Sequence, residues 1–80
     1  MSLTIEDAVA AVREVLEHKG VAVALTSDTP LAVLALDSLD LAEVLIILEE
    51  KARTDLDPRR SAPLRRVADL AALRPAAEEL

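Results

Sequence analysis

Residues 36–50, with the sequence LDSLDLAEVLIILEE, decide how the chain is expected to fold. On a helical wheel at about 100° per residue, four apolar residues of this stretch recur at i, i+3, i+4 and i+7: Leu41, Val44, Leu45 and Leu48. Such spacing is typical of a helix that buries one face. We therefore predict a helix that begins at Asp37 or Ser38, ends at about Arg53 and turns these four side chains toward the core.

The opposite side of this predicted helix carries a second apolar stripe that is bordered by acids. The stripe consists of Leu39, Ala42 and Ile46, with Glu43 and Glu50 beside it and Asp40 and Glu49 on its flanks. An apolar stripe on the outside of a helix usually marks an interaction surface. The alternative is a helix that is buried all round, which the periodicity also permits.

Local signals predict the elements on the N-terminal side. Thr4 followed by Asp7 approximates a capping box, and Gly20 is a common residue at a helix stop, so we expect a first helix from about Thr4 to Lys19. Residues 21–37 contain a turn cluster and scattered apolar residues. We expect them to form a long ordered connection with no more than one helical turn.

Towards the C-terminus the signals predict shorter elements. Asp57-Pro58 resembles an N-cap followed by proline, and it predicts a short helical turn. Pro63 is expected to start a last helix whose buried face is Leu64, Val67, Leu70 and Ala71. Arg74-Pro75 should end it, and residues 76–80 are expected to fray. The predicted fold is all-α: one domain over residues 1–80, a small bundle of three to four helices with a long ordered loop between the first two.

Composition narrows the class of protein further. The chain has 80 residues, no cysteine and no aromatic residue, so Leu, Val and Ile on helices must build the core. The net charge of −6 disfavours nucleic acid as a partner. No long apolar run predicts a membrane span, and the first residues do not resemble a signal peptide, so we expect a cytoplasmic monomer with no membrane partner.

The residues offer little for catalysis or metal binding. A nucleophilic Ser38 would need a base, and His18, the only histidine, lies at the end of a different predicted helix. Asp37, Asp40 and Glu43 share a helical spacing but lack the acidic loop and glycine of a calcium site. We therefore expect no enzyme activity, no catalytic residues and no metal.

The stretch from Asp37-Ser38-Leu39 to Glu50 resembles the phosphopantetheine attachment site of acyl carrier proteins. The resemblance implies an acyl-carrier-like bundle in which Ser38 carries 4′-phosphopantetheine, transferred from coenzyme A, with Asp37 and Leu39 as its recognition context. Acyl groups would travel as thioesters on this arm between enzymes of fatty-acid-like, polyketide or other secondary biosynthesis. A helix N-terminus also suits a phosphodiester, because it presents free N–H groups.

The resemblance also implies partners. These are a phosphopantetheinyl transferase and acyltransferase, ketosynthase or ligase-type enzymes that carry basic docking patches. The matching docking positions are Leu39, Asp40, Ala42, Glu43, Ile46, Glu49 and Glu50. Weak, fast, salt-sensitive contacts would suit a shuttle.

This chain departs from the family pattern in several places, two of which concern the approach to Ser38 and the pathway. Ala35 stands where the family usually has a glycine, and the region after the second helix is basic, with Arg59, Arg60, Arg65 and Arg66. The basic region favours a specialised pathway over primary fatty-acid synthesis. Two alternatives remain: a peptidyl carrier for aminoacyl groups, and a non-catalytic helical adaptor or oligomerisation module in which Ser38 is only a helix cap.

Overall fold

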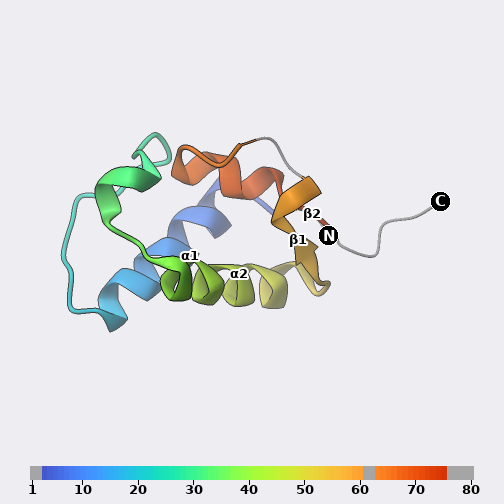
Figure 1. Cartoon of the computed structure of the whole chain (residues 1–80), viewed down its shortest axis with the longest axis horizontal. Coiled ribbons are helices and arrows are strands. Elements are labelled where there is room, and N and C mark those ends of the chain that lie inside the picture. The colour runs from blue at the N-terminus through green and yellow to red at the C-terminus, as the bar shows by residue number, and fades with distance from the viewer. Residues whose placement is uncertain (1–2, 61–62, 76–80) are drawn as a thin grey trace.

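The computed structural model of the chain describes residues 3–60 and 63–75. In these residues the chain is mostly helical. Its elements follow in the order α1 (Ile5–His18), the 3-10 helix η1 (Leu31–Leu34), α2 (Ser38–Ala52), β1 (Leu56–Asp57), the 3-10 helices η2 (Pro58–Arg60) and η3 (Val67–Ala72), and β2 (Arg74–Pro75) (Figure 1). The tail expected at 76–80 lies outside the described residues.

α1 begins and ends where the local signals place it. The Thr4 hydroxyl accepts a hydrogen bond from the Asp7 amide at 3.0 Å, and the Asp7 carboxylate accepts one from the Thr4 amide at 3.0 Å, which completes a capping box. Beyond Lys19, Gly20 has a φ of 75°, a left-handed conformation that glycine adopts without a steric penalty.

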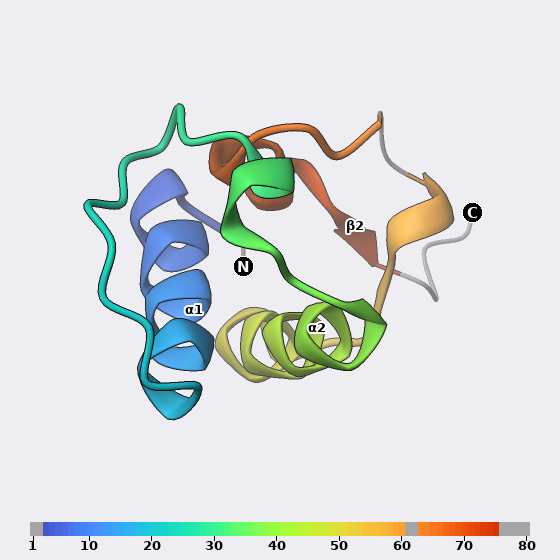
Figure 2. The same cartoon turned by 60° about the vertical axis from the view of Figure 1, so that its left-hand side comes forward.

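The connection between α1 and α2 lies against the chain that precedes η3. Pro30 forms an isolated antiparallel bridge with Arg66. In the bridge, the Leu31 amide donates to the Arg65 carbonyl at 2.8 Å. Two amides at the start of η3 also donate to the connection, Val67 to the Thr29 carbonyl at 3.0 Å and Ala68 to the Ser27 carbonyl at 2.9 Å. Figure 2 shows a non-helical stretch of chain leading from η1 to the start of α2.

The C-terminal region differs from the sequence prediction. Instead of starting a helix, residues 63–66 are non-helical, and η3 begins only at Val67. The reason is that the Arg65 and Arg66 amides donate to the Asp69 carboxylate at 2.8 and 2.9 Å, which caps the later start. After η3, Arg74 and Pro75 do not simply end a helix but form β2, which pairs antiparallel with β1.

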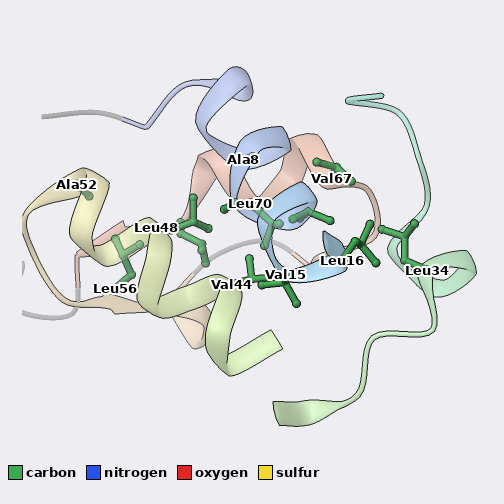
Figure 3. Close-up of a cluster of buried hydrophobic side chains, with 13 residues drawn as sticks. Ala8, Val15, Leu16, Leu34, Val44, Leu48, Ala52, Leu56, Val67 and Leu70 are labelled. Atoms are coloured by element: carbon green, nitrogen blue, oxygen red, sulfur yellow. The ribbon is translucent and has the colours of Figure 1, made fainter. Parts of the chain in front are cut away.

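The core lies where α1 packs against both α2 and η3 (Figure 3). Its largest fully buried side chains are Leu48, Val12, Val15, Val44 and Val67. The predicted core stripe of α2 is therefore confirmed for two of its members. Leu45 is partly buried, and Leu41 is 40% exposed, because it faces a cavity described below rather than α1.

Candidate functional site

The first turn of α2 is capped by Asp37. Its carboxylate accepts a hydrogen bond from the Asp40 amide at 2.8 Å, and the Asp40 carboxylate accepts one from the Asp37 amide at 3.1 Å. Ser38 is the first residue inside the helix. The idea that Ser38 serves only as the helix cap is therefore wrong, since Asp37 occupies that position.

Ser38 is exposed, and its hydroxyl is unpaired within residues 3–60 and 63–75. No hydrogen bond joins the hydroxyl to another group there, and the backbone amides of Ser38 and Leu39 also form none. Unpaired amides are the normal state of a helix's first turn. Together they present an oxygen nucleophile beside two N–H donors, an arrangement that suits a group bearing negative charge.

A lysine from the end of α1 reaches this turn. The Lys19 ammonium lies 2.5 Å from the Asp40 carboxylate and 3.5 Å from the Ala35 carbonyl. The Lys19 hydrogen bond, aided by that of the Asp37 amide, holds the pKa of Asp40 below its usual value, and the same contact raises the pKa of Lys19. Asp40, which was predicted on the flank of the outer stripe, is buried, at 8% exposure.

An apolar cavity of about 270 Å³ opens beside Ser38. It lies between α2 and the C-terminal segments, and its lining residues are Ser38, Leu41, Ala42, Val44, Leu45, Pro58, Leu64, Leu70 and Leu73. Sequence reasoning did not find this cavity. Periodicity assigned Leu41 and Leu45 to a packed interface, and only the fold brings Pro58 and Leu73 opposite them.

The outer stripe of α2 faces outward, so this helix is not buried all round. Leu39 is 76% exposed and Ile46 is 55% exposed, and Ala42 between them is also exposed. No helix, strand or loop of the described residues covers these side chains. They form the kind of patch that binds a partner.

The acids around this stripe have different surroundings. Glu43 and Glu50 are exposed and make no ion pair within the described part of the chain. Glu49 is half-buried, and its carboxylate accepts a hydrogen bond from the Leu56 amide at 2.9 Å. Glu49 therefore fastens the end of α2 to β1, which leaves Glu43 and Glu50 as the more available charges.

A groove of about 320 Å³ between α1 and α2 extends this outer surface. It is lined by Glu14, Val15, His18, Glu43, Ile46, Ile47 and Glu50. The sequence analysis did not assign Glu14 or His18 to a surface shared with α2. Their spacing along α1 places both on one side of that helix, but only the packing of α1 on α2 shows which side.

The basic residues after α2 lie in separate local contacts. The Arg59 side chain pairs with Asp57 at 3.2 Å. The side chains of Arg65 and Arg66 are exposed beside Pro30 and Asp69, where the protein surface is hollowed. Arg60 belongs to η2.

Within residues 3–60 and 63–75, no group of three or more histidine, cysteine or acidic side chains could hold a metal ion. In the same residues, no helix has the length and apolar character needed to cross a membrane. Comparisons of the chain with protein-family models, with curated proteins and with solved structures return no match.

Proposed function

We propose that the protein is an acyl carrier in which 4′-phosphopantetheine is attached through a phosphodiester to the Ser38 hydroxyl. The observation that supports this most is the position of Ser38, which is exposed in the first turn of α2 and borders an apolar cavity. Asp37 caps the helix, so Ser38 is not required for that role. No general base is hydrogen-bonded to its hydroxyl in the described residues. Such a serine suits modification by another enzyme better than catalysis of its own.

The residues around Ser38 fit this group. The Ser38 oxygen would carry the phosphodiester, and the unpaired amides of Ser38 and Leu39 would donate to its oxygens. When bound, the arm supplies a terminal thiol on which acyl groups are held as thioesters. Asp37 and Asp40 hold the turn in place through their reciprocal hydrogen bonds.

Attachment transfers the phosphopantetheine group from coenzyme A to the serine oxygen and requires no oxidant or reductant. The Ser38 oxygen forms a bond to the phosphorus of coenzyme A that bears the pantetheine arm. The bond from that phosphorus to the remaining nucleotide breaks, and 3′,5′-adenosine diphosphate leaves. The hydroxyl proton passes to a base of the transferase, which also supplies the magnesium.

The cavity beside Ser38 favours an apolar cargo. A cavity of roughly 150 Å³ lined by apolar side chains is large enough to bind benzene, and the one here measures about 270 Å³. A short acyl chain would bury apolar surface in it. The charged amine of an aminoacyl group would lose its hydration there, so a peptidyl carrier fits less well.

Partner enzymes are proposed to dock on the outer side of α2. Exposed Leu39 and Ile46 offer apolar contact, and unpaired Glu43 and Glu50 offer charge to basic patches. The partners would be the transferase and acyltransferase, ketosynthase or ligase-type enzymes of fatty-acid-like, polyketide or other secondary biosynthesis. The exposed Arg65 and Arg66 favour a specialised pathway. We propose that the carrier works as a monomer in the cytoplasm.

A helical adaptor is the competing function, because exposed Leu39 and Ile46 would also suit a permanent partner helix. It differs from a carrier in making no use of the Ser38 hydroxyl. The two functions therefore separate in one experiment on this residue.

The test is the intact mass of the apo protein after incubation with coenzyme A, magnesium and a broad-specificity phosphopantetheinyl transferase. Ser38→Ala removes the proposed site, and Ser27→Ala is the matched control in the loop. We expect wild type and Ser27→Ala to gain one phosphopantetheine group and Ser38→Ala to gain none. No gain in a folded wild type, alongside a carrier that is modified normally, would favour the adaptor.

A further inference from the structure

Lys19 contacts both sides of the turn that holds Ser38, although it belongs to another helix. It is the C-cap residue of α1. Its ammonium reaches the Ala35 carbonyl at 3.5 Å and the Asp40 carboxylate at 2.5 Å. Ala35 precedes Ser38 by three residues and Asp40 follows it by two, so one side chain spans the whole turn.

The contact with Asp40 is linked to the backbone next to Ser38 through a single atom. Asp40 Oδ2 accepts hydrogen bonds from both the Lys19 ammonium and the Asp37 amide, the latter at 3.1 Å. The return hydrogen bond runs from the Asp40 amide to Asp37 Oδ1 at 2.8 Å, so Asp37 and Asp40 each hold the backbone of the other. Losing Lys19 would leave a buried carboxylate without its counter-charge and would remove a contact that fixes the position of the oxygen accepting from the Asp37 amide.

Ala35 adds a second reason why this turn needs support. Its φ of 55° and ψ of 39° place it in the left-handed region, where a Cβ is disfavoured. A residue held in that region persists when its surroundings fix it. Lys19 contributes to this by donating to the Ala35 carbonyl.

We infer that Lys19 is a positioning residue for Ser38: it locks residues 35–40 to the end of α1 and so holds the serine in the orientation in which the transferase meets it. A lysine at a helix end would otherwise interact with the helix dipole and remain solvated. Here only a third of its side chain is exposed, and its partner carboxyl side chain is 11% exposed. The inference rests on the proposed carrier function for its kinetic consequence, but its structural part can be measured without it.

The kinetic test compares phosphopantetheinylation of wild type with Lys19→Met, Lys19→Arg and Lys51→Met. Lys51→Met removes the same charge from an exposed position on α2. If only about a tenth of the Lys19→Met molecules present the serine correctly, KM for the carrier should rise about tenfold while kcat changes little. Lys19→Arg should recover most of the loss, and Lys51→Met should match wild type.

The structural test is amide hydrogen exchange of the same apo proteins. In Lys19→Met the Asp37 amide should exchange faster, because its acceptor is loosened, while the amides in the middle of α1 keep their protection. Asp40→Asn offers a second variant: it keeps an oxygen that can accept from the Asp37 amide and loses the ion pair, so the same direction of change is expected.

The outcomes are distinguishable. If wild type is modified but Lys19→Met shows an unchanged KM and an unchanged Asp37 exchange rate, the inference about Lys19 is wrong and the carrier function stands. If wild type is not modified at all, the carrier function fails, and the exchange rates still decide whether Lys19 holds the turn. Should Lys19→Met not fold, Asp40→Asn with normal KM and normal exchange would overturn the inference.

Discussion

Replacing Ser38 with alanine is expected to leave the free energy of unfolding almost unchanged, whereas Asp37→Ala is expected to lower it. Asp37 is the residue whose carboxylate caps α2, with the Asp40 amide at 2.8 Å, and loss of such a cap costs about 1 kcal/mol. Ser38 is the first residue of the helix; its side chain is exposed and makes no hydrogen bond in the described residues. Exposed substitutions of this kind stay within about 0.5 kcal/mol, and alanine is the better helix former.

The two variants can be compared by thermal unfolding. In a domain of this size, 1 kcal/mol corresponds to a shift in Tm of about 4–8 °C, so Asp37→Ala should melt measurably below wild type and Ser38→Ala should not. The chain contains no tryptophan or tyrosine, so far-ultraviolet circular dichroism or calorimetry is the suitable readout. An equal loss of Tm in Ser38→Ala would refute the reasoning, because it would mean that the serine, and not Asp37, holds the helix start.

Three further predictions concern the core, the turn before α2 and acid stability. Leu48→Ala, at a fully buried position, should lower the free energy of unfolding by about 2–5 kcal/mol in urea titrations; a loss below 1 kcal/mol, the level of an exposed site, would contradict this core. Ala35→Gly should raise Tm, because glycine adopts the left-handed conformation without penalty, and an unchanged or lower Tm would argue against a strained turn. Hydrogen bonds lower the pKa of three aspartates in the folded protein: Asp7, Asp40 and Asp69. These carboxylates therefore stabilise the fold above their unfolded-state pKa, and this stabilisation is lost as the pH falls through their lower folded-state pKa values. Urea midpoints measured from pH 6 downward should therefore fall in acid, and a midpoint that rises below pH 4 would oppose the assignment.

The elements that the sequence predicts well are those specified by neighbouring residues. Thr4 and Asp7 start α1 through contacts three residues apart, and Gly20 follows its end. The same holds for the extent of α2, which follows from its apolar spacing. Signals of this kind need no knowledge of the tertiary fold.

The parts that the sequence does not predict depend on contacts between distant segments. Asp40 was predicted on the flank of the outer stripe, but it is buried and pairs with Lys19, 21 residues earlier in the chain. The last helix starts late because the backbones of Arg65 and Arg66 pair with the loop and donate to the Asp69 carboxylate. Leu41 lines a cavity that forms only when Leu73 is brought opposite it.

The same distinction applies to the candidate site. Its central residue and its apolar outer stripe were visible as a local pattern, and the structure places Leu39 and Ile46 on the surface. The pattern could not assign separate roles to the acids. Glu49 binds the Leu56 amide and Asp40 binds Lys19, so Glu43 and Glu50 remain the available charges.

The measurement that tests the central claim most directly is fragment-ion mass spectrometry of the tryptic peptide that follows Lys19 and ends at Lys51, taken from protein treated with coenzyme A and the transferase. This peptide contains two serines, Ser27 and Ser38. The account predicts one phosphopantetheine group, located on Ser38. Finding the group on Ser27, or finding the peptide unmodified while a known carrier in the same reaction is fully modified, would contradict it.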